Sequence, residues 1–291
     1  MSEIVRFTLD GREVTASKGQ SIWDVANDGG LVIPHLCHKP TTGYRPDGNC
    51  RACMVEIEGE RTLAASCVRE PTVGMVVHSN SIRATSARKM VVEMLMADQP
   101  ESAEAHDSSS HFYEMAKMND VKSSRLPPIE PDRIPILDDS HIAMSVNLDA
   151  CIQCGLCVRA CREVQVNDVI GMAGRGHDSF PTFDFNDPMG ESTCVACGEC
   201  VQACPTGALM PSSAVNDDQV GDSGDFDEEV KSVCPFCGVG CQVSIKVKNK
   251  KIKYVGFAPI TIATSAFSIS LNVAVTAPEP TFSRSAATDE A

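Results

Sequence analysis

Fifteen cysteines constrain this chain more than any other feature, because they are gathered into four groups along 291 residues. The groups hold four, four, four and three members: Cys37, Cys50, Cys53, Cys67; Cys151, Cys154, Cys157, Cys161; Cys194, Cys197, Cys200, Cys204; and Cys234, Cys237, Cys241. The N-terminal sequence has no basic region followed by an apolar run and no twin arginine, so we expect a cytoplasmic protein. In that reducing compartment, cysteines repeated at tight spacings are typical of metal ligands and not of disulfides. We therefore predict that all fifteen bind metal.

Composition narrows the class of protein. An apolar content of 43% with 22% charged residues is ordinary for a globular protein, and the length allows two or three domains. The formal net charge is -14, from 25 Lys and Arg against 39 Asp and Glu. Because nucleic-acid binding depends on a basic surface, we expect no nucleic-acid partner.

The second and third groups share the spacing C-x2-C-x2-C-x3-C and form an internal repeat. In such a run three cysteines hold one 4Fe-4S cluster, and the fourth binds the neighbouring cluster. This rule assigns Cys151, Cys154, Cys157 and Cys204 to one cluster, and Cys161, Cys194, Cys197 and Cys200 to the other. Pro205 follows the second run as is usual, whereas Arg162 follows the first. Zinc is the alternative, but zinc sites use pairs of C-x2-C and have no use for a third cysteine at this spacing.

The first group, spaced C-x12-C-x2-C-x13-C, indicates a 2Fe-2S site with a longer loop than the plant-type C-x4-C-x2-C spacing. His35 and His38 flank Cys37, so a Rieske-type site with two histidines and two cysteines is the alternative. Four cysteines already suffice, however, and the adjacent pair Cys37 and His38 lacks the Rieske spacing. We expect both histidines to lie beside the site without binding metal.

Local patterns predict a small domain of strands and one helix around the first group. Alternating apolar residues on both sides of Asp10-Gly11 predict a β-hairpin over residues 4–16. Ser21 is a suitable N-cap for a helix that ends at Gly29-Gly30. This domain is expected to end near residue 80.

Further segments are predicted after this domain. Residues 81–98 form a helix, whose apolar face is expected in the core and comprises Met90, Val91, Met94 and Leu95. Four prolines in residues 121–136 exclude a regular helix and indicate a connector. The acidic stretch 216–230 is interpreted as a solvated tether.

The last cysteine group, in CPFCGVGC (234–241), is spaced C-x2-C-x3-C and supplies three ligands where a cubane needs four. The sequence contains no cysteine after Cys241. Residues 255–278 carry no charge, which raises the question of a membrane helix. Apolar residues alternate with polar or small ones over residues 267–276, and this period favours a strand, so no membrane span is expected.

The order of these motifs resembles the N-terminal half of the catalytic alpha subunit of NAD-dependent formate dehydrogenases that contain molybdenum or tungsten, within the molybdopterin oxidoreductase family. The resemblance covers residues 1 to about 255, and FCGVGC favours the molybdopterin group. Related segments occur in the large subunit of respiratory complex I and in iron-only hydrogenases. The resemblance implies an α+β protein with these parts: a β-grasp 2Fe-2S ferredoxin domain (1–80), a helix and proline-rich connector (81–145), a tandem 4Fe-4S ferredoxin domain (146–212), an acidic linker (213–230), a partial molybdopterin-type 4Fe-4S segment (231–255) and an atypical tail (256–291).

The same resemblance implies the cofactors and partners. We expect one 2Fe-2S cluster, two 4Fe-4S clusters and a third, incomplete 4Fe-4S or 3Fe-4S site, with a molybdenum or tungsten pterin only in a full-length relative or a partner. The expected partner is a flavin- and NAD-binding iron-sulfur subunit, together with a pterin-bearing chain where that domain is separate. The implied function is electron relay for formate oxidation, with no catalytic residue in this chain. The alternative is a stand-alone iron-sulfur carrier or adaptor subunit of another oxidoreductase, of the hydrogenase or complex I type.

Two positions depart from the family pattern. Relatives carry a His-x3-Cys-x2-Cys-x5-Cys cluster after the helix, and the corresponding residues here are Gln99, Ala103, His106 and Phe112, so that cluster is predicted absent. Relatives also place a fourth ligand downstream of the last site, and this chain lacks it. We expect the third cubane site to be empty or labile. Loss of family character after Tyr254 fits a shortened or frame-altered product.

Overall fold

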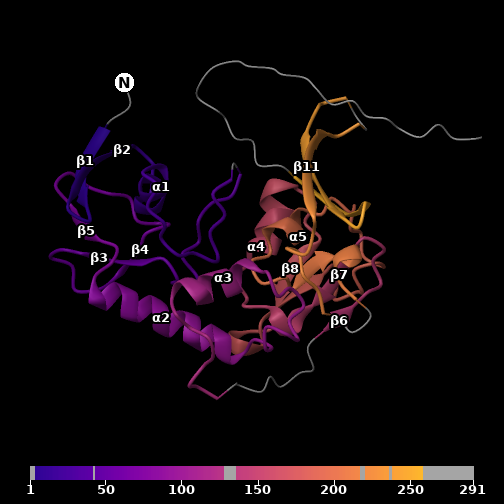
Figure 1. The fold of residues 1–291 in the computed structure, drawn as a ribbon. Helices are drawn as coiled ribbons and strands as arrows, with labels where there is room; N and C mark the ends of the chain where they lie inside the picture. The colour runs from indigo at the N-terminus through magenta and orange to yellow at the C-terminus, as the bar shows by residue number, and fades with distance from the viewer. Residues whose placement is uncertain (1–3, 42, 128–135, 217–219, 236–237, 258–291) are drawn as a thin grey trace, which may run out of the picture. The chain divides into compact units, whose positions relative to one another are not determined.

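The computed structural model describes residues 4–41, 43–127, 136–216, 220–235 and 238–257, and Figure 1 shows the ribbon. Cys237 lies outside the described residues, as do part of the proline-rich connector and the alternating stretch at 267–276. The described residues combine helices with several small sheets, so the predicted α+β class is confirmed.

The predicted hairpin opens the N-terminal sheet. β1 (Ile4–Leu9) pairs antiparallel with β2 (Arg12–Ser17) along the whole length of both strands. Asp10 and Gly11 form the turn with φ angles of 47° and 78°, the left-handed values that a two-residue hairpin requires. The sheet has the order β2-β1-β5-β3-β4, with β5 parallel to β1. Its remaining strands are β3 (Met54–Ile57), β4 (Ala64–Ala65) and β5 (Val76–His78).

Helix α1 (Ile22–Asp28) begins at the predicted N-cap. The Asp24 N–H donates to Ser21 Oγ at 3.1 Å, and the Ser21 N–H donates to the Asp24 carboxylate at 2.9 Å, which forms a capping box. The Trp23 indole N–H donates to the Ile33 carbonyl at 2.9 Å and orients the chain that leads to the first cysteine. The core of this domain is made of buried apolar side chains that include Phe7, Leu9, Ile22, Val55 and Val77.

Helix α2 (Ile82–Ala97) confirms the predicted helix, but it buries a different face. Met90 and Met94 are 42% and 55% exposed, so the prediction that they pack in the core is wrong. Three of the buried residues are spaced four apart, Ala84, Arg88 and Val92, and Glu93 is also buried. Arg88 Nη1 donates to the carbonyls of Met54 and Ser79 at 2.9 and 2.6 Å. A guanidinium, and not the methionines, therefore joins α2 to the N-terminal sheet.

A second helix, α3 (His111–Met118), follows α2 and was not predicted. The N–H of Phe112, whose ring is fully buried, donates to the Pro205 carbonyl at 2.8 Å. His106 is also fully buried, and its Nδ1 donates to the Gly207 carbonyl at 2.5 Å. These contacts attach residues 106–112 to the chain immediately after Cys204.

The internal repeat of cysteines becomes a repeat of short helices. α4 (Leu156–Arg159) and α5 (Glu199–Ala203) follow Gly155 and Gly198, whose φ angles are 71° and 74°. A positive φ angle favours glycine, because glycine has no Cβ to clash with the backbone. Each glycine therefore permits the turn from the cysteine loop into the helix. The surrounding short elements are β6 (Leu137–Asp138), β7 (Met144–Asn147), β8 (Ile170–Ala173), β9 (Phe180–Phe183), β10 (Leu209–Pro211), the 3-10 turns η1 (Leu148–Ala150), η3 (Gly176–Asp178) and η4 (Ser212–Ala214), and the π-helical turn η2 (Ala160–Val164).

The interpretation of residues 216–230 as a solvated tether is wrong for the described part of that stretch. The Gly221 N–H donates to the Ala105 carbonyl, and Ser223 Oγ donates to the Asp107 carboxylate at 2.8 Å. A three-stranded antiparallel sheet begins within the stretch. Its strands are β11 (Glu228–Val233), β12 (Gln242–Lys248) and β13 (Lys251–Phe257).

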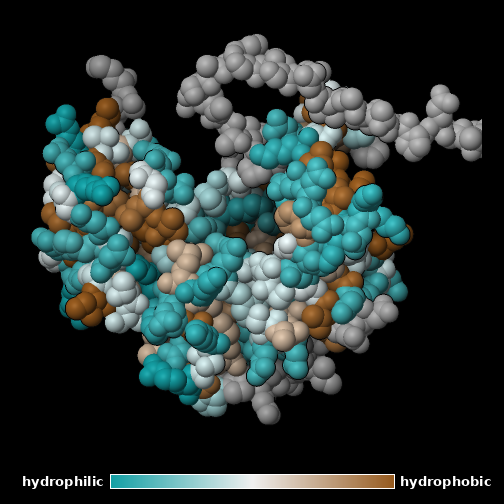
Figure 2. All heavy atoms as spheres, in the orientation of Figure 1, coloured by the Kyte–Doolittle hydropathy of each residue, from teal (hydrophilic) through white to brown (hydrophobic). Residues whose placement is uncertain are grey.

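The surface drawn in Figure 2 is mostly hydrophilic, with hydrophobic residues in separate groups. No helix in the described ranges combines the length and the apolar character needed to cross a bilayer. Most of the uncharged stretch 255–278 lies outside those ranges.

Gly207 tests how tightly the His106 segment packs. Its φ angle is 76°, and an added Cβ would overlap the Cβ of Asp107. We expect Gly207→Ala to lower the free energy of unfolding by about 2–4 kcal/mol, because left-handed strain adds to overpacking. Gly59→Ala is the control, since Gly59 has a φ angle of 81° but open space around the added methyl. Denaturant unfolding followed by circular dichroism measures both, and equal losses would contradict tight packing.

Candidate metal centres

The first four cysteines lie together as two pairs. The Cys37 N–H donates to Cys50 Sγ and the Cys50 N–H donates to Cys37 Sγ, each at 3.4 Å. Cys53 Sγ and Cys67 Sγ are 3.4 Å apart. The Ala52 N–H also donates to Cys50 Sγ at 3.5 Å, a contact of the kind that tunes a bound cluster. The structure therefore brings together all four cysteines of this group.

Each pair contains one thiol that ionises readily. The hydrogen bond with Cys37 lowers the pKa of Cys50 to about 7, and the hydrogen bond with Cys67 lowers the pKa of Cys53 to about 7. The pKa values of Cys37 and Cys67 are raised, because each retains its proton beside a thiolate. Two pairs of soft sulfur donors are suitable for the two irons of a 2Fe-2S cluster, with Cys37 and Cys50 at one iron and Cys53 and Cys67 at the other.

The next eight cysteines line two separate cavities. One cavity is lined by the first three cysteines of the first run and the last cysteine of the second: Cys151, Cys154, Cys157 and Cys204. The other is lined by the complementary set: Cys161, Cys194, Cys197 and Cys200. The structure thus brings together the same two sets of four that the spacing rule assigns, and the ligand role of these thiols stays a proposal.

Burial differs between and within the two sets. Burial raises the pKa values of Cys154, Cys157 and Cys200 well above the usual range of a thiol. An unpaired thiolate would be unfavourable at those positions, so a bound cationic centre would offset the cost of ionising them. Cys197 is exposed, which places one corner of the second set at the surface.

The two sets of thiols each stand around a cavity. Soft thiolate donors arranged around a space fit a polynuclear iron-sulfur centre.

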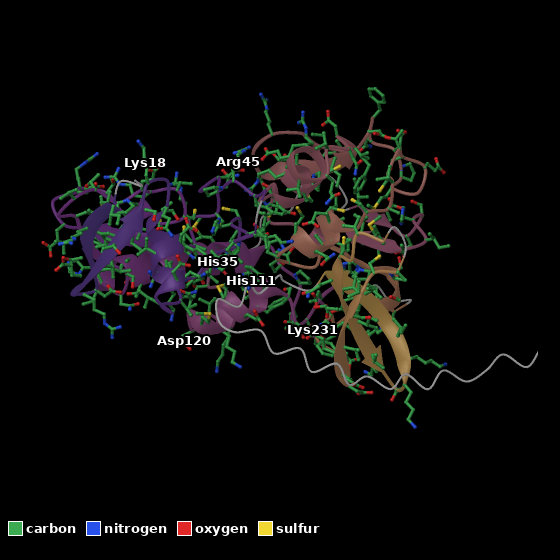
Figure 3. All side chains as sticks on the ribbon, turned by 90° about the horizontal axis from the view of Figure 1, so that it is seen from above. Lys18, His35, Arg45, His111, Asp120 and Lys231 are labelled. Atoms are coloured by element: carbon green, nitrogen blue, oxygen red, sulfur yellow. The ribbon has the colours of Figure 1, made fainter. Side chains whose placement is uncertain are left out.

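Three histidines and a tryptophan gather beside Cys37. The Trp23 ring lies 4.6 Å from the rings of both His35 and His38 in edge-on contact. The His111 ring lies 4.9 Å from that of His35, and His111 Nε2 donates to the His35 carbonyl at 2.9 Å. Figure 3 shows His35 and His111 close together. His111 was not singled out from the sequence, because it enters the group from α3 and no local spacing signals it.

Burial shapes the chemistry of this aromatic group. Burial lowers the pKa of His35 to about 4, so its ring is neutral near pH 7. His38 is 7% exposed, and its ring nitrogens make no hydrogen bond among the described residues. The ring contacts agree with the prediction that His35 and His38 lie beside the first site. The prediction that neither histidine binds metal remains untested.

The last group of cysteines is only partly described. The Cys234 N–H donates to the Cys241 carbonyl at 2.8 Å, which closes the loop between β11 and β12. Cys241 is exposed and Cys237 lies outside the described residues. The predicted incomplete site therefore stays a prediction.

The residues at the positions of the additional family cluster serve other contacts. Phe112 belongs to a buried cluster with Leu36 and Ala52 near the first cysteine group, and Ile152, which follows Cys151, packs against the same cluster. The side-chain nitrogen and oxygen of Gln99 are buried and make no hydrogen bond among the described residues, and Gln99 lines an open cavity together with Tyr113. His106 is engaged with Gly207, as described above. The absence of that cluster remains a prediction.

The long loop between Cys37 and Cys50 contacts the tandem cluster domain. The hydroxyl of Tyr44 donates to Glu199 Oε1 at 2.6 Å, and Lys39 Nζ lies 3.3 Å from the same oxygen. Glu199 is the first residue of α5 and directly precedes Cys200. Burial, followed by the bond to Glu199, raises the pKa of Tyr44, so its hydroxyl stays a donor.

Comparisons with known protein families agree with this arrangement. Residues 2–81 match the 2Fe-2S iron-sulfur cluster binding domain. Residues 150–208 match the 4Fe-4S dicluster domain. Residues 227–259 match the molybdopterin oxidoreductase Fe4S4 domain.

Individual relatives come from several oxidoreductases. One chain in a crystal structure of an NAD+-reducing NiFe-hydrogenase in the H2-reduced state is 31% identical with a TM-score of 0.64, covering 72% of this chain and 88% of that chain. The NADP-reducing hydrogenase subunit HndD of Solidesulfovibrio fructosivorans is 31% identical over 71% of this chain and 36% of its own length. The formate dehydrogenase-like protein YrhE of Bacillus subtilis is 29% identical over 87% of this chain and 30% of its own length. The chain thus spans about a third of the length of these two curated relatives.

The fold and the grouped thiols define an iron-sulfur protein with a 2Fe-2S domain, a 4Fe-4S dicluster domain and a molybdopterin oxidoreductase Fe4S4 segment. The chain belongs to the family of iron-sulfur electron-transfer subunits of the molybdopterin-oxidoreductase type. The predicted resemblance to this family is confirmed. The narrower assignment to formate dehydrogenase stays a proposal.

Tyr44 tests the contact between the first loop and α5. We expect Tyr44→Phe to lower the free energy of unfolding by about 2 kcal/mol, because the buried Glu199 carboxylate loses a hydrogen-bond donor. Tyr254→Phe is the matched control, since its hydroxyl donates to the neutral Ser223 carbonyl at 2.7 Å. Its expected loss is about 1 kcal/mol. Denaturant unfolding compares the two, and a larger loss for Tyr254→Phe would contradict the contact described here.

Proposed function

We propose that this chain relays electrons, one at a time, between a molybdopterin site that oxidises formate and a flavin- and NAD-binding partner subunit. The observation that carries the proposal is the exchange of Cys161 and Cys204 between the two cubane cavities. Such an exchange is the ligand pattern of two-cluster ferredoxins, whose centres carry single electrons when bound. A reducing cytoplasm, where free thiols persist, is the proposed location.

The residues of this chain supply positions and surroundings rather than catalysis. The paired thiols at Cys37/Cys50 and Cys53/Cys67 would hold the 2Fe-2S centre, and the two sets of four would hold the cubanes. Hydrogen bonds such as that from Ala52 N–H to Cys50 Sγ would adjust the potential of the first centre. Metal chemistry at formate, by contrast, would belong to a pterin domain or a separate chain.

The formate branch is supported by the match at residues 227–259 and by the similarity to YrhE over 87% of this chain. A hydrogenase branch is the second candidate, because the chain covers 88% of a chain from an NAD+-reducing hydrogenase structure. Anaerobic purification from the native host, followed by identification of co-purifying chains, separates the two. A pterin-bearing chain or domain supports the formate branch, and a nickel-bearing hydrogenase chain overturns it.

Iron content tests the number of centres. We expect about ten irons per chain after anaerobic purification, as two, four and four, because the third cubane lacks a fourth cysteine. Chemical iron analysis against quantified protein gives the number. A value near fourteen would mean that the third cubane site is filled. A value near two would contradict the proposal that the chain holds two cubanes.

Exchange of the fourth cysteines gives a sharper test. We expect Cys204→Ala to damage the cluster of Cys151, Cys154 and Cys157, since Cys204 lines that cavity. Cys161→Ala is the reciprocal control and should damage only the cluster of Cys194, Cys197 and Cys200. EPR spectra of the two reduced variants distinguish the two clusters. The assignment fails if each substitution damages the cluster of its own run.

A further inference from the structure

A single buried arginine touches the backbone of two cysteines that belong to different proposed centres. Arg159, the last residue of α4, is 3% exposed. Its Nη2 donates to the Cys37 carbonyl at 2.7 Å and to the Cys154 carbonyl at 3.4 Å. One guanidinium therefore lies between the 2Fe-2S site and the first cubane site.

The surrounding contacts hold this guanidinium in place. Arg159 Nη1 donates to the Arg45 carbonyl at 2.5 Å, and Arg159 Nε lies 3.1 Å from Asp47 Oδ2. Arg45, labelled in Figure 3, forms ion pairs with Asp47 and with Glu163. Nη1 and Nη2 of Arg159 thus donate to carbonyls of the loop between Cys37 and Cys50, while Nε makes no hydrogen bond among the described residues and is held near Asp47 by the ion pair alone. These contacts tie α4 to that loop.

The two sites also share a packed core at this point. Cys37 and Cys154 belong to one cluster of buried side chains. Phe112 belongs to a second buried cluster, and both Cys50 and Ile152 pack against that cluster. A charge placed here is screened less than one at the surface, so its effect on both sites is stronger.

We propose that Arg159 is a positioning residue that fixes the spacing of the 2Fe-2S centre and the first cubane and raises the reduction potentials of both. The inference rests on the proposed function, since it requires both centres to be bound. In the proposed function an electron would arrive from the formate-oxidising site and leave to the flavin partner, and its transfer between the two centres would form or break no bond. A buried positive charge favours the more negative, reduced state of each centre, and hydrogen bonds at ligand residues act in the same direction.

The test compares three variants of the anaerobically purified protein by EPR-monitored redox titration. Arg159→Met removes the charge and the hydrogen bonds and leaves a shorter, unbranched, apolar side chain. We expect the equilibrium constant for reduction of each of the two centres to fall about tenfold, which corresponds to about 59 mV for one electron. The potential of the second cubane, on Cys161, Cys194, Cys197 and Cys200, should change least.

Arg159→Lys and Arg88→Lys complete the set. Lysine at position 159 keeps the charge but cannot donate to both carbonyls in the same geometry, so both potentials should fall by less than in Arg159→Met. Arg88 is the matched control, because it is also buried and donates to the Met54 carbonyl beside Cys53 but has no hydrogen bond to the cubane loops among the described residues. Arg88→Lys should leave the potential of the first cubane unchanged.

The outcomes separate this inference from the proposed function. A wild-type protein without iron or EPR signals contradicts the proposed function itself. Full cluster content with unchanged potentials in Arg159→Met, or a change at only one centre, overturns the role of Arg159. If Arg159→Met fails to retain its clusters, the inference is tested by the two lysine variants. It is overturned if Arg159→Lys and Arg88→Lys change the reduction potential of the first cubane equally.

Discussion

The exchange of Cys161 and Cys204 between the two cubane cavities is the constraint on which the central domain depends. Each cavity takes three thiols from one run and one from the other, so neither can be completed until residues at least 33 positions apart have met. The short helices α4 and α5 serve this exchange, since each carries the chain from its third cysteine toward the cavity of the other run. The two cysteine runs and their short helices must therefore pack against each other for the eight thiols to form the two sets.

A second dependence links this domain to the N-terminal one. The loop between Cys37 and Cys50 is longer than in plant-type ferredoxins, and its side chains reach both short helices. Tyr44 contacts Glu199 at the start of α5, while the carbonyls of Cys37 and Arg45 accept from Arg159 at the end of α4. The additional loop length therefore holds neighbouring sites together. Side chains in the middle segment, such as Phe112, fill the space between them with apolar contacts.

Buried charge is used sparingly in a chain of net charge -14. Arg88 and Arg159 are both at most 5% exposed, and both donate to carbonyls in or next to cysteine-bearing loops. Carbonyl oxygens that accept from the Nη atoms offset part of the cost of burying each guanidinium, although neither Nε makes a hydrogen bond among the described residues. These two arginines join segments that are distant in sequence. Hydrogen bonds fix the relative orientation of such segments more closely than apolar contacts alone. Met90 and Met94 of α2, in contrast, are exposed.

The sequence by itself determined the features that depend on near neighbours. Asp10-Gly11 specified the hairpin, Ser21 specified the start of α1, and the cysteine spacings predicted which thiols would meet. Tertiary structure alone decided the buried face of α2, the entry of His111 beside Cys37, and the packing of the acidic stretch against Asp107. Each of these depends on contacts between residues far apart in the chain, whereas propensity and spacing report only on local backbone preference. The position of Arg159 between two cysteine loops belongs to the same group, because no local pattern distinguishes an arginine that faces solvent from one that donates to three carbonyls.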